Sequence, residues 1–289
     1  MKNRINIEEI LRRLEKEGIK VEKETFDQFV NSIEAEIINY IPKIGIFGKT
    51  GVGKSSLCNA LFGEDVAEVN DVEACTREPN EYILNIGAES SIKLIDMPGL
   101  GESVEKDHLY QKLYKNLLPK LDCLLWVVKA DDRALSVDQH FHEKVLGNKA
   151  HKYPLVLALN QIDKIEPFRE WNVETNCPSD SQWKNVTKKR DLIYETLNVS
   201  RRNIIPVSAL EGYGLPNLTT RLIQILPDDK KYALYARMKL EFITNETKEE
   251  VKEAMVKTFL KKIGKFAWDH KAEIAISLAG IILGGKKLK

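Results

Sequence analysis

The eight residues Gly48-Lys49-Thr50-Gly51-Val52-Gly53-Lys54-Ser55 decide the fold. The segment before them, 43–47, is typical of a short buried strand, and the segment after them, 57–62, is typical of a helix. The pattern G-x-x-x-x-G-K-[ST] between a strand and a helix predicts a phosphate-binding loop. Its glycines let successive backbone N–H groups surround phosphate oxygens, and the positive end of the helix dipole adds to the attraction.

Two side chains of this loop have assigned tasks. We expect Lys54 to reach the β- and γ-phosphates and the Ser55 hydroxyl to bind Mg²⁺. The backbone on both sides of them is expected to contact the nucleotide as well. The candidate phosphate-binding residues are Gly48, Lys49, Thr50, Gly51, Val52, Gly53, Lys54, Ser55 and Ser56.

Apolar strands alternate with helices along the middle of the chain. The periodicity predicts strands at 43–47, 81–87, 91–96, 121–128, 154–160 and 203–207, and helices at 57–62, 105–119, 136–147, 180–197 and 215–226. Continuous apolar strands separated by helices are typical of an α/β fold with a mostly parallel sheet covered on both faces. We therefore predict a P-loop NTPase domain at 41–227, with helical segments at 1–40 and 228–289.

A second motif, Asp96-Met97-Pro98-Gly99, ends the predicted strand 91–96. Asp96 is placed to hold the hydration shell of Mg²⁺, and the Gly99 amide to meet the γ-phosphate. Asp-x-Pro-Gly alone is a common turn, so this motif gains weight only from its position. The polar loop 64–79 carries Thr76, the best-placed hydroxyl for a second Mg²⁺ ligand. The expected catalytic groups are Lys54, Thr76 and Gly99, and the expected metal ligands are Ser55, Thr76 and Asp96.

Two further strand ends indicate which base is bound. Asn160-Gln161-Ile162-Asp163 follows the strand 154–160, and Ser208-Ala209-Leu210 follows the strand 203–207. The Asp163 carboxylate can accept both guanine N1–H and the guanine N2 amino group, a pair of donors that adenine lacks. A backbone amide of the second motif can donate to guanine O6. The predicted ligands are therefore GTP and GDP with Mg²⁺, bound also by Asn160, Gln161, Asp163, Ser208, Ala209 and Leu210.

Together these motifs resemble the translation-factor-related GTPases of the Era/TrmE/septin-like branch. More narrowly, the stretches Leu124–Val137 and Gln161–Trp171 look like those of the bacterial YfjP-type GTPases. The resemblance covers about 41–227 and implies a Ras-like fold and hydrolysis of GTP to GDP and phosphate.

The chain departs from the family pattern at three positions. The fourth motif usually reads Asn-Lys-x-Asp, and the shorter, uncharged Gln161 predicts weaker and faster-exchanging nucleotide. Leu100 stands where Ras-type enzymes carry the glutamine that orients water, and Gly51 stands where some relatives carry a K⁺-binding asparagine. Hydrolysis is therefore expected to be slow until a partner or a second copy completes the site, with Arg77 and Arg133 as candidates for the missing positive charge.

Charge and the N-terminal sequence bear on location and partners. The formal net charge of the 289 residues is +1, which predicts no strong attraction to nucleic acid. The start of the chain leads into a charged helix rather than an apolar core, and a cytoplasmic location is expected. The apolar stretch Ile274–Gly285, followed by lysines, is too short to span a bilayer. It is expected either to pack on the N-terminal helices or to attach to a membrane surface.

Two classes of function stay open. A regulatory GTPase would recruit a protein, RNA or ribosome partner in its GTP state. The 62 residues after Pro227 show neither the strands nor the Gly-x-x-Gly loop of an RNA-binding KH domain, so nucleic acid is disfavoured. The alternative is an assembly or membrane-associated GTPase of septin or immunity-related type, which would form a homodimer with GTP. A GTP-binding scaffold with little hydrolysis is a third reading.

Overall fold

The computed structural model describes residues 31, 35–37, 39–63, 80–85, 91–96, 112–132, 134–147 and 152–269. The chain divides into two compact units. One comprises Ile41–Leu226 and Arg237–Thr244, and the other comprises Met1–Tyr40, Pro227–Ala236 and Asn245–Lys289.

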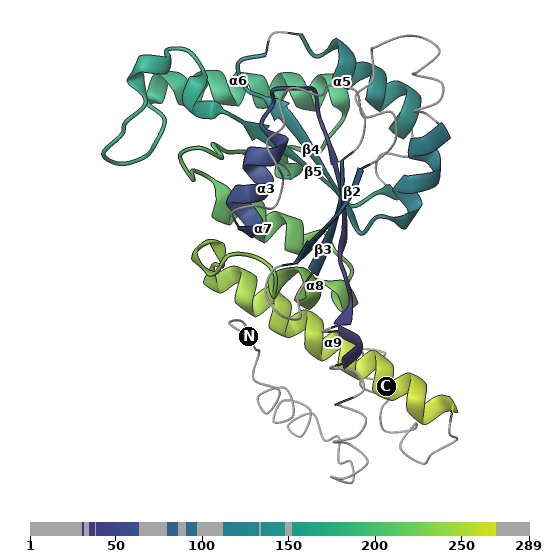
Figure 1. Cartoon of the computed structure of the whole chain (residues 1–289). Coiled ribbons are helices and arrows are strands. Elements are labelled where there is room, and N and C mark those ends of the chain that lie inside the picture. Colours follow the sequence, from purple (N-terminus) through teal and green to yellow (C-terminus); the bar gives the residue numbers. More distant parts are fainter. Residues whose placement is uncertain are drawn as a thin grey trace, which may run out of the picture. The chain divides into compact units, whose positions relative to one another are not determined.

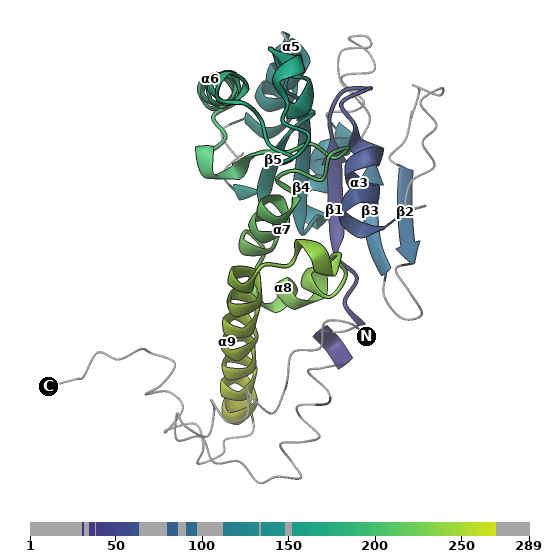
Figure 2. The ribbon, with the colours of Figure 1, turned by 90° about the vertical axis from the view of Figure 1, so that its left-hand side faces the viewer.

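The first unit is built on a sheet in the order β2-β3-β1-β4-β5-β6 (Figures 1 and 2). The strands are β1 (Lys43–Phe47), β2 (Asn80–Asn85), β3 (Ser91–Asp96), β4 (Cys123–Lys129), β5 (Leu155–Asn160) and β6 (Ile204–Pro206). Among these described strands only β2, at the edge, is antiparallel to its neighbour. The prediction of a mostly parallel sheet is confirmed.

Helices cover both faces of this sheet. They are α3 (Lys54–Phe62), α5 (Ser136–Phe141), α6 (Asp180–Leu197) and α7 (Leu215–Gln224). Helix α3 contacts α7 and helix α5 contacts α6, and the two pairs lie on opposite faces (Figures 1 and 2). Helix α6 begins where the sequence predicts, because the Ser179 hydroxyl accepts from the Gln182 amide N–H at 3.1 Å and the Gln182 side chain accepts from the Ser179 N–H.

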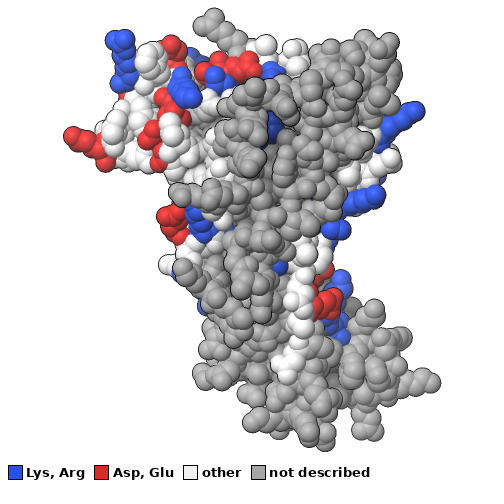
Figure 3. Space-filling model, in the orientation of Figure 1, with Lys and Arg blue, Asp and Glu red and all other residues white. Residues whose placement is uncertain are grey.

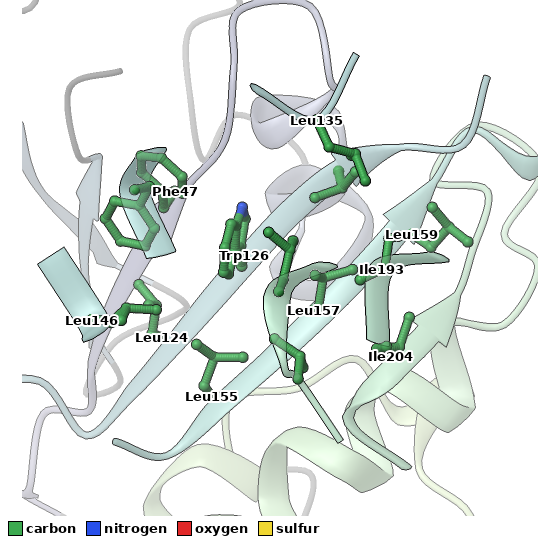
Figure 4. Close-up of a cluster of buried hydrophobic side chains, with 14 of the residues drawn as sticks. Phe47, Leu124, Trp126, Leu135, Leu146, Leu155, Leu157, Leu159, Ile193 and Ile204 are labelled. Carbon is green, nitrogen blue, oxygen red and sulfur yellow. The ribbon is translucent and has the colours of Figure 1, made fainter. Parts of the chain in front are cut away.

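The core explains the apolar runs of the central strands. Every residue of β5 is buried, and so are the first six of β4, since both faces of these strands are covered. Figure 4 shows part of the cluster that they form with α5 and α6. Phe47 stacks on Phe141 with ring centroids 3.6 Å apart, and both rings meet Trp126 edge-on. This packing fixes the end of β1, from which the phosphate-binding loop starts.

Two helices differ from their predictions. The helix expected at 136–147 is α-helical only to Phe141 and continues as the π-helical turn His142–Leu146. In the helix expected at 105–119, the described residues 112–117 are helical and a 3₁₀ turn, Leu118–Lys120, follows. Pro119 explains this ending, because its ring clashes with the preceding helical turn and it has no N–H to donate.

The second unit contains α8 (Asp228–Tyr235) and α9 (Asn245–Asp269), which contact each other extensively. Lys231 is almost fully buried and pairs with Glu250 and, at 3.2 Å, with Asp228. Lys262 of α9 pairs with Glu36 of the N-terminal segment. No helix among the described residues is both long and apolar enough to cross a membrane, and the stretch Ile274–Gly285 lies outside those residues.

Candidate nucleotide-binding site

The sequence motifs gather at one edge of the sheet. Asp96 at the end of β3 pairs with Ile46 near the end of β1, and Pro206 of β6 pairs with Leu159 near the end of β5. In the sheet, β2 and β3 lie on one side of β1, and β4, β5 and β6 lie on the other, so the strand order reverses at β1. Ligands of open parallel sheets bind at such a point, outside the carboxyl ends of the strands.

The phosphate-binding loop has a backbone that only glycine adopts readily. Gly51 and Gly53 have φ angles of 78° and 87°, in the left-handed region. A Cβ on Gly53 would lie 2.6 Å from Nδ2 of Asn160, so strand β5 approaches the loop closely. Lys54 Nζ donates to the carbonyl oxygens of Gly48 at 3.0 Å and Lys49 at 3.3 Å. The ammonium group thus lies against the loop, where arriving phosphate oxygens could replace the carbonyls.

Asn160 links the two ends of the site. Its side chain is 1% exposed, and its Nδ2 donates to the Val52 carbonyl at 2.9 Å. Its Oδ1 accepts from the Ala209 N–H at 3.1 Å. One buried amide therefore joins the phosphate-binding loop to the loop after β6. Asn160 is thus a structural link, and the second N–H of its Nδ2 and the second lone pair of its Oδ1 can still serve a ligand.

Gln161 also contacts the phosphate-binding loop. Its Nε2 donates to the Gly51 carbonyl at 3.1 Å, and its Oε1 accepts from Lys164 Nζ at 3.2 Å. Gln161 therefore reaches the phosphate-binding loop despite its shorter side chain, and weaker, faster-exchanging nucleotide stays a prediction. The connection to the loop is present, and Lys164 supplies a positive charge beside it.

Asp163 has a free acceptor. Its Oδ1 is shielded from solvent and has no hydrogen-bond partner among the described residues. Gln182 of α6, which is fully buried, donates to the Ile165 carbonyl at 3.1 Å and supports the turn after Asp163. A carboxylate that lacks a protein donor in a shielded position is costly unless a ligand supplies one. An acceptor without a protein donor at this place is what the predicted recognition of guanine N1–H and the guanine N2 amino group requires.

The loop after β6 uses most of its own amides. The Ser208 N–H donates to the Tyr213 carbonyl at 3.0 Å, and the Ala209 N–H donates to Asn160. Within the predicted Ser208-Ala209-Leu210 segment, Leu210 has the remaining N–H, for which no acceptor exists among the described residues. Leu210 is 79% exposed. Of the three amides predicted as candidate donors to guanine O6, the Leu210 N–H is therefore the one without a protein acceptor among the described residues.

The later part of the connection between β5 and α6, to which the sequence assigned no part in the site, supports this loop. Trp171 packs edge-on against Tyr213 with centroids 5.6 Å apart, and Asn176 donates to the Glu211 carbonyl at 2.6 Å. Both residues belong to the connection between β5 and α6. Trp171 ends the YfjP-like stretch, but the sequence did not predict these contacts, because they join residues about 35 to 42 positions apart in the chain.

Several predicted residues lie outside the described ones: Thr76, Gly99, Leu100, Arg77 and Arg133. Ser55 and Ser56 lie in the first turn of α3, half-buried and exposed, respectively. No group of three or more His, Cys, Asp or Glu side chains gathers among the described residues. A Mg²⁺ ion held by a serine hydroxyl and substrate phosphates is compatible with this, because Mg²⁺ keeps several waters and few protein ligands.

The comparisons with known proteins agree with the motifs. Residues 43–161 match the family model described as 50S ribosome-binding GTPase. The Escherichia coli proteins YkfA and YfjP are 40% and 39% identical to this chain, over 75% of it and 73% and 74% of their own lengths. GTPase Era of Alkaliphilus oremlandii is 30% identical over 85% of this chain and 83% of its own. The chain belongs to the Era-like P-loop GTPases. Membership supports guanine-nucleotide binding and GTP hydrolysis as the general activity.

Similarity is also found to a solved structure. Era in complex with MgGDPNP and a segment of 16S ribosomal RNA is 27% identical, with a TM-score of 0.49. The match covers 65% of this chain and 57% of that one.

Proposed function

We propose that this protein binds GTP and GDP with Mg²⁺ at the carboxyl ends of β1, β3, β5 and β6, and hydrolyses GTP to GDP and phosphate. The observation that carries the proposal is the buried Asn160 side chain. It donates to Val52 at 2.9 Å and accepts from Ala209 at 3.1 Å. A phosphate-binding loop and a base-binding loop joined in this way can hold the two ends of one nucleotide.

Each end has a distinct task. At the base, the Asp163 carboxylate accepts from guanine N1–H and N2–H, and the Leu210 N–H donates to O6. At the phosphates, Lys54 and the loop N–H groups neutralise negative charge. Ser55 and Asp96 would hold Mg²⁺, which supplies further charge neutralisation on the phosphate being transferred. Thr76 and Gly99 are proposed to complete the contacts to the γ-phosphate.

Nucleotide competition tests the base assignment. GDP and GTP should bind far more tightly than ATP, since adenine offers Asp163 no pair of donors. Asp163→Asn should lose guanine affinity by about a hundredfold and gain affinity for xanthosine diphosphate, because the amide can donate to xanthine O2. Equal binding of ATP and GTP by the unaltered protein would refute the guanine site.

Hydrolysis is proposed to be slow in the isolated protein. Leu100 cannot orient water as a glutamine would, and Gly51 lacks the side chain that holds K⁺ in some relatives. A protein partner or a second copy bound in the GTP state would supply the missing group. The turnover per molecule should then rise with protein concentration, and particle size should be larger with a non-hydrolysable GTP analogue than with GDP. A concentration-independent rate and constant size would exclude self-activation.

A second candidate function is that of an assembly or membrane-associated GTPase. It is favoured by the second unit, whose segments precede and follow the G domain in the sequence: within it α8 and α9 contact each other and Lys262 pairs with Glu36. On the face shown in Figure 3, the described acidic and basic side chains are interspersed. Flotation with liposomes, with and without residues 270–289, tests the membrane role, and low turnover at every concentration would favour a GTP-binding scaffold.

A further inference from the structure

Lys49 is the second residue of the phosphate-binding loop, a position at which the motif allows any residue. Its Nζ donates to Asp132 Oδ2 at 2.8 Å, approaches Asp138 Oδ2 at 3.3 Å and also donates to the Ala134 carbonyl. The side chain is therefore directed to the connection between β4 and α5. Two carboxylates and a carbonyl thus hold the Lys49 ammonium group at this connection.

One of the two carboxylates beside Lys49, that of Asp138, is buried. It is 1% exposed, and its second oxygen accepts from Trp126 Nε1 at 3.0 Å. Burial raises the pKa of Asp138, while the charge of Lys49 and the indole hydrogen bond act in the opposite direction. Burial lowers the pKa of Lys49, but Asp132 and Asp138 more than offset it, so the net shift is upward and Lys49 stays charged.

A second lysine holds the same connection from the other side. Lys189 of α6 is 9% exposed and donates to the backbone carbonyl of Asp132. The Ala134 N–H donates to Asp132 Oδ1 at 3.0 Å. Asp132 is thus fixed independently of the phosphate-binding loop, and Lys49 reaches toward a rigid acceptor. Lys189 contacts this connection but not the loop, so its substitution tests how much the position of Asp132 contributes.

We propose that Lys49 is a positioning residue, which holds the first half of the phosphate-binding loop against β4 and α5 and thereby sets nucleotide affinity. This inference rests on the proposed nucleotide site. Gln161 and Asn160 hold the loop at Gly51 and Val52, but the glycines themselves offer no side chains for anchoring. Lys49 supplies the corresponding attachment at the start of the loop.

Equilibrium binding of fluorescent GDP to the full chain tests the effect on affinity. Lys49→Met should raise the dissociation constant about tenfold, because part of the loop order would have to be restored on binding. Lys49→Arg, which keeps the charge and the donors, should restore affinity to within about threefold of the original. Lys189→Met removes a contact that holds Asp132 but keeps the pair between Lys49 and Asp132, so it should raise the dissociation constant less than Lys49→Met does.

Trp126 provides a readout that separates positioning from direct phosphate contact. The other three tryptophans are replaced by phenylalanine, and GDP affinity is first checked in this background, because Trp171 contacts Tyr213 of the loop after β6. Saturating GDP should then change Trp126 emission through Asp138 and Lys49. The change should disappear in Lys49→Met at saturating GDP and persist in Lys189→Met. If Lys49→Met does not fold, Asp132→Asn, which removes the carboxylate charge and keeps an acceptor, is expected to raise the dissociation constant in the same direction.

Two results would overturn the inference. Unchanged affinity in Lys49→Met, or in Asp132→Asn when Lys49→Met does not fold, means that the loop needs no such attachment. Reduced affinity with an intact Trp126 response means that Lys49 acts on the phosphates directly. A failure of the proposed function looks different, because the unaltered protein would then bind neither GDP nor GTP.

Discussion

The phosphate end and the base end of the site are built differently. The loop from Gly48 to Ser55 depends on backbone conformation, with left-handed glycines at positions 51 and 53. The loop from Ser208 to Gly214 depends on contacts with distant residues, including the Trp171–Tyr213 ring pair. The phosphate-binding loop can be recognised from residue types alone. The conformation of the loop after β6 depends on contacts between residues that are far apart in the sequence. Asn160 joins the two.

The largest effect is expected where both ends depend on one close approach. Gly53→Ala places a Cβ 2.6 Å from Asn160 Nδ2 and forces alanine to a φ of 87°. We expect the free energy of unfolding to fall by about 2–4 kcal/mol and GDP affinity to fall at least about thirtyfold.

Gly51→Ala is the matched control for this substitution. Its φ is 78°, but an added Cβ meets nothing within 4 Å, so only the backbone strain remains. Denaturant unfolding without nucleotide should show a loss of about 1–2 kcal/mol, smaller than that at Gly53. Equal losses for the two alanines would mean that the approach of Asn160 is unimportant to stability.

These glycines show why much of the phosphate end could be predicted from the sequence. The motif names the residues that tolerate left-handed backbone, and the strand and helix around it follow from apolar periodicity. Lys49 shows the limit of this reasoning. Its motif position is unrestricted, and its partners Asp132 and Asp138 lie 83 and 89 residues further along the chain.

The base end was predictable only in outline. The sequence singled out the Ser208-Ala209-Leu210 segment, but it could not predict which N–H group the protein leaves unbonded, because that depends on which N–H groups Asn160 and Tyr213 accept from. The contribution of Gln161 was also missed. Its reach to the Gly51 carbonyl depends on a left-handed φ of 61°, which sequence does not reveal for a glutamine.

The second largest effect on GDP affinity is expected at Asn160, whose side chain joins the phosphate-binding loop to the loop after β6. Asn160→Ala leaves the Val52 carbonyl and the Ala209 N–H without partners, and GDP affinity should fall about 10- to 100-fold. Asn160→Asp can still accept from Ala209 but cannot donate to Val52, so it separates the two halves of the link. Calorimetric titration measures the GDP affinity of Asn160→Asp. The affinity should be close to that of Asn160→Ala if the bond to the Val52 carbonyl contributes more to binding. It should stay close to that of the original protein if the bond from the Ala209 N–H contributes more.

A smaller effect is expected from Leu210→Pro, which removes the N–H assigned to guanine O6. Affinity should fall about three- to tenfold, the value of one neutral hydrogen bond. Leu210→Ala keeps the N–H and should bind GDP nearly as well as the original, since the leucine side chain is 79% exposed. Similar losses for both substitutions would move the role from the amide to the side chain.

The smallest effect is expected at Gln161, although it is the most visible departure from the family motif. Gln161→Lys restores the usual residue, but Lys164 Nζ already lies 3.2 Å from the Gln161 side-chain oxygen. Two ammonium groups there would repel each other, and the glutamine already donates to the Gly51 carbonyl. We therefore expect GDP release rates, measured by displacement of fluorescent GDP, to change less than about threefold. The double variant Gln161→Lys/Lys164→Ala should release GDP more slowly than Gln161→Lys, because the two ammonium groups no longer repel each other. A slowing of about tenfold or more by Gln161→Lys alone would show that the family lysine acts through the base and its charge, and not through its attachment to the phosphate-binding loop.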